Sequence, residues 1–312
     1  MFGLLLRRLL ATLPVMGVVA VVVFLLIHLS PGDPAALIAG DLATVDDIAR
    51  LRVALGLDQP LWRQFVVWLA RVLSGDLGTS IFTQVPVTRL LAQRLEPTLS
   101  IAFFTMLIAV AVSVPLGTLA AHRAGSWVDR AVMLFAVLGF SVPVFLVGYL
   151  LMYGFAIQLG WFPVQGYARL ADGVGPWLRS LALPCLNLAL LYMALLTRMT
   201  RATVLEVLQQ DYIRTARAKG LGVPAVLMHA LRNAAVPIAT TVGVGIALLI
   251  GGVVVTETVF AIPGIGRLVI DSVQRHDYPV IQSVLLLSAA AYVGVNLLID
   301  LSYPLLDPRI RH

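Results

Sequence analysis

The residues most able to do chemistry, five histidines and a single lysine, form no catalytic motif. The histidines are scattered, and the sequence contains neither a His-Glu-x-x-His pair nor a Gly-x-Ser-x-Gly nucleophile elbow. Lys219 follows Ala218, so the Gly-Lys-Ser/Thr ending of a phosphate-binding loop is absent. Cys185 is the one cysteine, which excludes an internal disulfide or a cysteine pair for a metal. The sequence therefore predicts no enzyme, no metal site and no ATP site in this chain.

Charged side chains inside apolar segments would indicate a transporter coupled to protons or sodium. The long apolar runs of this chain contain no Asp, Glu, Lys or Arg. His28, Glu257 and Asp300 lie near the ends of these runs, where solvation at the membrane interface is the expected state. Pro143 could break a helix and expose backbone ligands, which leaves ion coupling as a minor alternative.

The most informative segment runs from Glu206 to Gly222. Its apolar residues recur at helical spacing on one face, and Glu206, Arg214 and Arg217 fall on the other. Gly220, Gly222 and the following proline predict the end of the helix. The apolar face consists of Val207, Leu208, Tyr212, Ile213 and Ala216. This pattern predicts a short amphipathic helix, which either lies on anionic lipid or docks into a partner protein.

The elements around this segment are those of a membrane protein. Of the 312 residues, 60% are hydrophobic and 12% are charged, whereas a soluble domain carries about 25% charged residues. Uncharged runs of about 20 residues can cross a bilayer as helices, and helices satisfy their own backbone there. We expect an all-α integral membrane protein with six spans, at Leu9–Leu29, Thr98–Ala121, Ala131–Leu159, Leu181–Thr197, Ala234–Thr256 and Val280–Ile299.

The distribution of basic residues predicts the orientation of the spans. Arg7 and Arg8 could begin a signal peptide, but the apolar run after them is too long, and we expect a retained first helix. If both termini are cytoplasmic, the inner loops hold most of the 22 basic residues and few of the 16 acidic ones. The net charge of +6 then belongs to a membrane-facing inner surface. Nucleic-acid binding is not indicated, because no basic helix or aromatic stacking platform accompanies the charge.

The segment from Ser30 to Pro97 is predicted to be a small folded cap outside the cytoplasm. Thr44, with Asp47 three residues later, predicts a helix start, and Pro60 predicts a second helix that ends before Gly75. We expect three parts: a first helix with cap, 1–97; a core of five spans, 98–304, with a cytoplasmic coupling loop at 198–235; and a cytoplasmic tail, 305–312.

Several motifs, in this order and spacing, resemble those of one family. They are Pro31-Gly32-Asp33-Pro34, Gly56-Leu57-Asp58-Gln59-Pro60, Gly75-Asp76-Leu77-Gly78, Asp211 through Leu221, His229-Ala230-Leu231-Arg232-Asn233, Glu257-Thr258-Val259-Phe260 with Pro263-Gly264-Ile265-Gly266-Arg267, Asp277-Tyr278-Pro279-Val280 and Pro308-Arg309-Ile310-Arg311. The chain resembles permease subunits of ABC importers, and it is most similar to the B-type permeases of dipeptide, oligopeptide and glutathione importers. Arg214-Thr215-Ala216 stands where the wider importer signature has Glu-Ala-Ala, so a glutamate contact to the motor is not carried over.

The resemblance implies the type I ABC importer permease fold, in a bacterial inner membrane with both termini cytoplasmic. It implies a C-type permease partner, two ATPase subunits that bind ATP and Mg²⁺, an extracytoplasmic binding protein and surrounding lipid, with no cofactor in this chain. The implied ATPase-coupling residues are Asp211, Tyr212, Arg214, Thr215, Ala216, Arg217, Ala218, Lys219, Gly220 and Leu221. The implied docking residues for the binding protein are Asp33, Asp76, Arg267, Asp277 and Tyr278.

Peptides or glutathione are the substrates that the resemblance favours. Nickel or another small solute, carried by the same machinery, is the alternative, because nickel permeases share these motifs. A membrane scaffold that transports nothing is a more distant alternative. The sequence does not decide between these substrates, because specificity in such importers lies largely in the binding protein.

Overall fold

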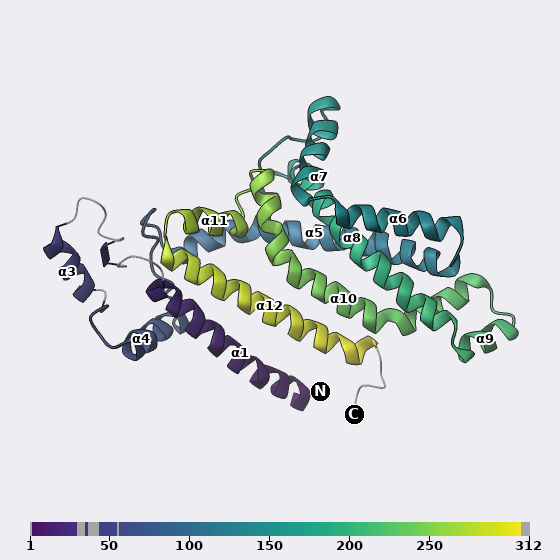
Figure 1. Cartoon of the computed structure of the whole chain (residues 1–312), viewed down its shortest axis with the longest axis horizontal. Helices are drawn as coiled ribbons and strands as arrows, with labels where there is room; N and C mark the ends of the chain where they lie inside the picture. Colours follow the sequence, from purple (N-terminus) through teal and green to yellow (C-terminus); the bar gives the residue numbers. More distant parts are fainter. Residues whose placement is uncertain (1, 30–34, 37–43, 55, 307–312) are drawn as a thin grey trace. The chain divides into compact units, whose positions relative to one another are not determined.

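The described residues of the computed structural model, 2–29, 35–36, 44–54 and 56–306, form helices joined by turns (Figure 1). A single isolated β-bridge in these residues joins Thr79 and Pro86. The helices are α1 (Phe2–Leu29), α3 (Val45–Ala54), α4 (Leu61–Leu73), α5 (Val87–His122), α6 (Trp127–Ser141), α7 (Val144–Leu151), the π-helical η1 (Met152–Gln158), the 3₁₀ turn η2 (Leu170–Asp172), α8 (Val174–Leu208), α9 (Asp211–Ala218), α10 (Val223–Val259), α11 (Ile265–Gln274) and α12 (Tyr278–Leu306).

Five helices in the described residues are long and apolar enough to cross a membrane, and a bent pair brings the number to as many as six. The expected single helix at Ala131–Leu159 is wrong. The chain there forms α6 and then α7 with η1, and the two parts are bent by 102° at Val142–Pro143. Proline has no N–H to continue the helix, and it forces the preceding residue out of helical geometry. Val142 accordingly has φ −87° and ψ 128°.

The helices extend well past the apolar runs that identified them. The run at Leu181–Thr197 lies inside α8, which has 35 residues and ends at Leu208. Glu206 and Val207 therefore belong to α8, and the expectation of one amphipathic helix starting at Glu206 is wrong. The shorter helix α9 begins only at Asp211, after Gln210 adopts an extended conformation with ψ 151°.

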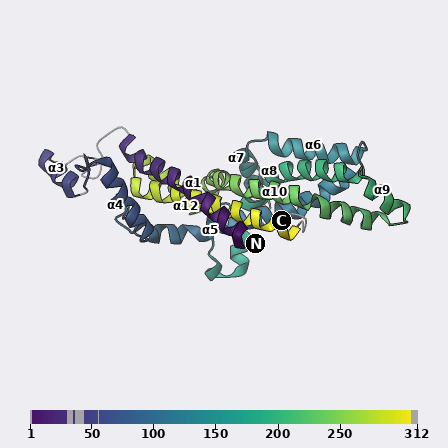
Figure 2. The ribbon, with the colours of Figure 1, turned by 90° about the horizontal axis from the view of Figure 1, so that it is seen from below.

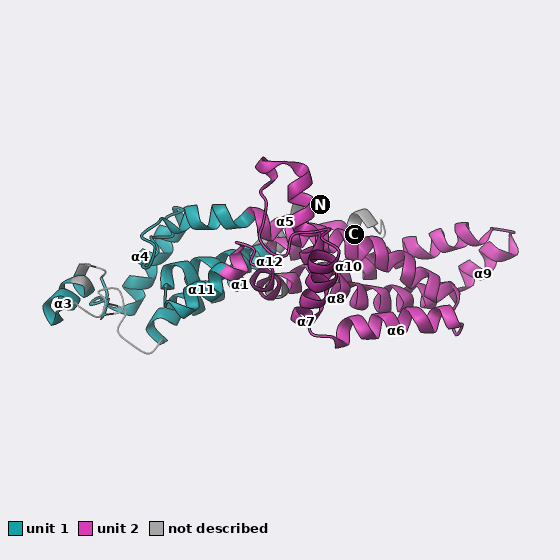
Figure 3. Cartoon of the chain, turned by 90° about the horizontal axis from the view of Figure 1, so that it is seen from above, with its two compact units in different colours: residues 1–95, 268–293 teal, residues 96–267, 294–312 magenta. Residues whose placement is uncertain are grey.

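The chain divides into two compact units (Figure 3): unit 1 holds residues 1–95 and 268–293, and unit 2 holds residues 96–267 and 294–312. The return of residues 268–293 to the N-terminal unit was not predicted from the sequence.

Within unit 1 the predicted start of the first cap helix is confirmed. The Thr44 hydroxyl accepts a hydrogen bond from Asp47 N at 3.2 Å, and the Asp47 carboxylate accepts one from Thr44 N at 3.2 Å. The hydrogen bonds from Thr44 hold the pKa of the Asp47 carboxyl below its usual value.

The second predicted cap helix is confirmed as α4, which starts directly after Pro60. It ends before Gly75, whose φ of +84° favours glycine.

In unit 2, α8 lies alongside α6 and α10 (Figures 1 and 2). Its buried side chains, among them Leu188, Leu196 and Val204, supply much of the core. The helix α5 approaches α8 closely at Gly117, where a Cβ atom would lie 2.7 Å from Thr200 Cβ and 2.8 Å from the Thr197 carbonyl oxygen. Small residues permit such close approach of helices in membranes.

The contact at Gly117 generates a stability prediction. A Gly117→Ala substitution places a methyl group against the backbone of α8, and we expect a loss of about 1–3 kcal/mol from overpacking. The measurement is thermal unfolding of the detergent-purified chain, followed by size-exclusion chromatography. Gly17→Ala is the matched control, because a Cβ at Gly17 of α1 meets nothing within 4 Å. Equal stability of the two variants would contradict the close approach of α5 and α8.

Candidate functional site

The helix α9 carries all but three of the residues that the sequence assigned to coupling. Asp211 stands in its first turn and Arg217 in its last, which are the charges that a helix dipole favours at those ends. Lys219, Gly220 and Leu221 follow the helix and close it. Gly220 has φ +81°, and Leu221 N donates to the Ala216 carbonyl oxygen at 3.2 Å. This is the glycine-terminated end that the sequence predicted.

Two side chains attach α9 to the rest of unit 2. Ile213 is completely buried and packs in a cluster with Val204 and Leu208 of α8 and Val226 of α10. Asn233 of α10 donates a side-chain hydrogen bond to the Tyr212 hydroxyl. These two contacts join α9 to both α8 and α10.

The remaining side chains of this segment are available to a partner. Arg214, Thr215, Arg217, Ala218 and Lys219 are exposed. The exposed ion pair between Arg214 Nη1 and Asp211 Oδ1, at 3.2 Å, is of the kind that contributes little to stability. The α9 segment is thus fixed on one face, and small and cationic side chains are free on the other.

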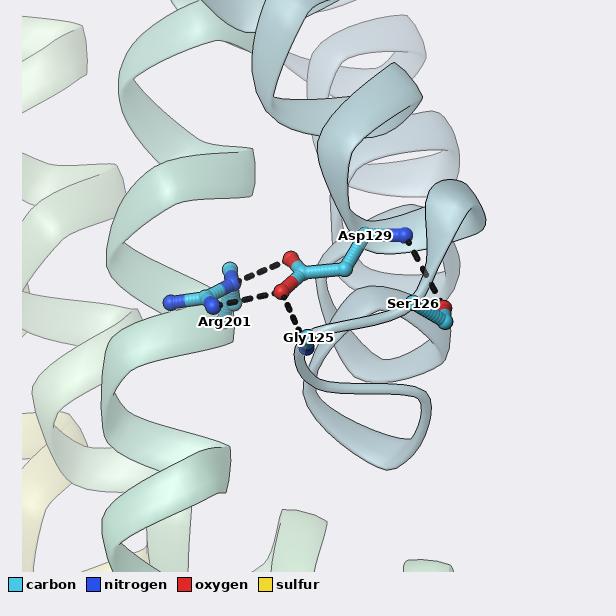
Figure 4. Close-up of polar contacts among 4 residues, drawn as sticks. All are labelled: Gly125, Ser126, Asp129 and Arg201. Atoms are coloured by element: carbon cyan, nitrogen blue, oxygen red, sulfur yellow. Dashed lines mark hydrogen bonds and ion pairs between the residues drawn. The ribbon is translucent and has the colours of Figure 1, made fainter.

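An ion pair joins α8 to the start of α6, directly after the α5–α6 turn (Figure 4). It was not predicted from the sequence. Arg201 of α8 donates from Nε to Asp129 Oδ1 at 2.5 Å and from Nη2 to Asp129 Oδ2 at 2.7 Å. Gly125 N donates to the same carboxylate at 2.9 Å, and Ser126 caps α6 by accepting from Asp129 N. The sequence offered no signal for this pair, because its two partners stand 72 residues apart on different helices.

The pair holds the α5–α6 turn against α8. Asp129 is 4% exposed, so it can remain charged only because Arg201 and a backbone amide face it. Arg201 lies on the same helix that carries Val204 and Leu208, the residues that contact Ile213 of α9. The turn, α8 and α9 are thereby joined in one continuous set of contacts.

Glu257 forms a second buried polar centre in unit 2, at the last turn of α10. Its carboxylate accepts from the Thr98 hydroxyl at 2.6 Å and from Arg267 N at 2.9 Å, and Ile265 N donates to Thr98 Oγ1 at 2.9 Å. The expected solvation of Glu257 at the membrane interface is wrong, because the residue is completely buried. A Cβ at Gly264 would lie 2.0 Å from Glu257 Oε1, so the glycine lets the turn close over the carboxylate.

The residues assigned to binding-protein docking differ in exposure. Asp76 is exposed, and its carboxylate accepts from Gly78 N at 2.9 Å. Arg267 is partly buried. Asp277 and Tyr278 are buried, at 4% and 6% exposure. The fifth residue, Asp33, lies outside the described residues.

The Asp277 carboxylate is used inside unit 1. It accepts from the Ser80 hydroxyl at 2.5 Å and from Ile81 N at 3.1 Å. This contact fastens the turn that follows Gly78 to the turn before α12. The docking role of Asp277 stays a prediction. Its side chain is buried and hydrogen-bonded within unit 1.

Two family models together match all of the chain except residues 103–112. The family described as "Binding-protein-dependent transport system inner membrane component" matches residues 113–312. The family of the N-terminal part of such membrane components matches residues 1–102.

Individual relatives are similar over their full lengths. A probable peptide ABC transporter permease of Sinorhizobium fredii is 54% identical over 98% of both chains. A putative peptide transport system permease of Brucella abortus is 45% identical, and a glutathione transport system permease of Salmonella choleraesuis is 44% identical, each over 100% of both chains.

The fold is also similar to that of a solved structure, the methionine ABC transporter MetNI in an inward-facing conformation. The TM-score is 0.59 at 17% identity, and the match covers 70% of this chain and 97% of the other. At this identity the similarity shows the fold alone.

The ion pair between Asp129 and Arg201 generates a stability prediction. The exposed pair between Asp211 and Arg214 on α9 serves as its control. Asp129→Ala removes the carboxylate that faces Gly125 N and the partly exposed guanidinium of Arg201, and we expect a loss of about 1–3 kcal/mol in the free energy of unfolding. Asp211→Ala removes an exposed pair and should change stability little. Thermal unfolding of both purified variants is the measurement.

The charge exchange Asp129→Arg with Arg201→Asp tests the interaction itself. Because the opposite charges still face each other, the double variant should be more stable than Asp129→Ala. If the double variant is no more stable than the single one, the ion pair is not what holds the turn.

Proposed function

The chain belongs to the family of binding-protein-dependent transport system inner membrane components, and we propose that its substrates are peptides or glutathione. It is a multi-pass inner membrane permease component and not a catalytic subunit. The observation that carries the substrate proposal is full-length similarity to peptide and glutathione permeases, at 54% and 44% identity. The proposed translocation route lies between this chain and a second permease of the C type.

The proposed assembly adds two ATPase subunits and an extracytoplasmic binding protein to the two permeases. The family requires a binding protein and an ATP-driven motor, and the subunit numbers are part of the proposal. ATP and Mg²⁺ would bind to the ATPase subunits. Both termini and α9 are placed in the cytoplasm, because that orientation puts most of the basic residues on the inner side.

The helix α9 is the proposed contact with an ATPase subunit. Its residues Arg214, Arg217 and Ala218 are exposed, as is Lys219 directly after it, whereas Ile213 is buried in the cluster. A groove on the ATPase would accept the small side chain of Ala218 and the bare backbone at Gly220. Rotation of the ATPase would then move α9, and with it α8 and α10, as a rigid group.

Docking of the binding protein is proposed for the cap, 30–97, and the segment 260–279. Asp76 and Arg267 have side chains that can reach a partner. Asp277 and Tyr278 would act by holding the shape of that surface, since both are buried. Asp33 is proposed on the resemblance of its motif alone.

Reconstitution tests the transport function and its substrate together. The chain is co-expressed with a C-type permease and ATPase subunits of a peptide importer and placed in proteoliposomes with the binding protein. The substrates offered are dipeptides, tripeptides, longer peptides, glutathione and nickel. We expect ATP-dependent uptake of peptides or glutathione. Uptake of nickel alone would overturn the substrate proposal, and assembly without any uptake would favour the scaffold.

Ala218→Arg tests the coupling contact. The bulky cation should lower uptake at least about tenfold while ATPase activity continues, because a displaced contact costs upwards of about 1.4 kcal/mol. Gly220→Trp should have the same effect, although its positive φ also strains the helix end. The readout is the ratio of substrate transported to ATP hydrolysed.

Ala218→Ser is the control, since it keeps a small exposed side chain at the same position. If Ala218→Arg transports normally in a correctly inserted assembly, α9 does not dock at this residue.

A further inference from the structure

One face of α4 is apolar and uncovered in the part of the chain that the structure describes. The helix has no buried residue, and Trp62, Val66 and Leu73 are 70%, 56% and 79% exposed. At about 100° per residue these three positions fall on one side of the helix, and we call them the Trp62 row. A set of large apolar side chains on one helix face indicates a partner surface.

Another face of α4 fixes its position relative to α1. The Phe24 ring lies 5.3 Å from the Phe65 ring and 5.6 Å from the Trp68 ring, measured between centroids. His28 Nε2 lies 3.0 Å from Gln64 Oε1. Phe24 and His28 belong to the last two turns of α1, so α4 is attached where that helix ends.

That end of α1 is a membrane boundary. The apolar stretch Leu10–Leu29 has 20 residues, which as a helix span about 30 Å, the thickness of the hydrocarbon core. Val18, Val22 and Leu29 of this stretch are exposed apolar residues that run to the same end. A helix fastened to Phe24 and His28 therefore lies near the level of the lipid headgroups.

The polar residues of α4 lie away from the Trp62 row. Arg63, Gln64 and Arg71 line a cavity of about 380 Å³ with Gln59 and Gln282, all within unit 1. The helix is thus apolar on one side and basic on the other. This distribution, with a tryptophan on the apolar side, is typical of helices that lie in a membrane interface.

We propose that the Trp62 row inserts into the headgroup boundary of the bilayer, on the side where α1 ends. The occupant of this face is a phospholipid surface. The cap is thereby fixed at the membrane through α4. This role is separate from transport of any particular substrate and does not depend on which solute is carried.

Site-directed labelling with paired cysteines tests the proposal. Val66→Cys places an environment-sensitive fluorophore on the Trp62 row. Val67→Cys is the matched control, because it starts from the same residue type, is also exposed, and lines the cavity beside Arg63 and Arg71 instead of the Trp62 row. Both are made in a Cys185→Ala background, which removes the one native thiol.

The labelled full-length chain is reconstituted in nanodiscs of phosphatidylethanolamine and phosphatidylglycerol, with and without lipids that carry a nitroxide near the headgroup. We expect nitroxide quenching at position 66 to exceed that at position 67 by about twofold or more, with a blue-shifted emission at position 66. Equal quenching at the two positions would overturn the proposal. A label at 66 that nitroxide lipid does not quench, and that is shielded only when the binding protein is added, would assign the row to a protein partner and would also overturn it.

A second variant guards against a folding artefact. Trp62→Ser with Val66→Ser should leave the chain monodisperse in detergent, since neither side chain is buried. In nanodiscs it should weaken quenching of a label at Leu73→Cys. Unchanged quenching at 73 would mean that the row does not hold α4 against the lipid.

Discussion

Hydrocarbon offers no hydrogen-bond partners, so a chain that crosses a membrane must satisfy its backbone polar groups internally. The consequence here is a set of helices that run past their apolar segments: α5, α8 and α10 have 36, 35 and 37 residues. Long helices of this kind place their ends, and the turns that join them, at or beyond the lipid boundary. The turns then need stabilising interactions of their own, because the apolar packing of the spans does not reach them.

Buried carboxylates provide those interactions by accepting hydrogen bonds. Asp129 accepts from Gly125 N and Arg201, Glu257 accepts from Arg267 N and Thr98, and Asp277 accepts from Ile81 N and Ser80. In each case one donor is a backbone amide and the other is a side chain from an element distant in sequence. The amides of Gly125 and Ile81 lie in turns, and that of Arg267 lies in the first turn of α11. A charge-assisted hydrogen bond is stronger than a neutral one, and a buried carboxylate left without donors would be costly. The same chemical device therefore closes three different turns, one in unit 1 and two in unit 2.

The α9 segment combines a fixed face with a free one, which is what a mechanical contact requires. Burial of Ile213 and the hydrogen bond between Asn233 and Tyr212 join it to α8 and α10. The cations beyond them are solvated. The Asp129–Arg201 pair joins α8 in turn to the start of α6, so these contacts connect α9 with α8, α10 and α6. The cap helix α4 shows a comparable division, with one face on α1 and another that is free.

The sequence by itself determined the features that depend on neighbouring residues. Apolar runs indicated the spans, Thr44 and Asp47 indicated the start of α3, and Gly220 indicated the end of the coupling segment, because helix formation and capping are local. The order of the motifs also indicated the family. Only the tertiary structure decided the 102° bend between α6 and α7, since Pro143 signals a break but not its angle. It also decided that Glu257 is buried and that Asp129 meets Arg201. A carboxylate near a helix end has the same local sequence whether water or a distant donor satisfies it, and the packing of the helices determines which donor arrives.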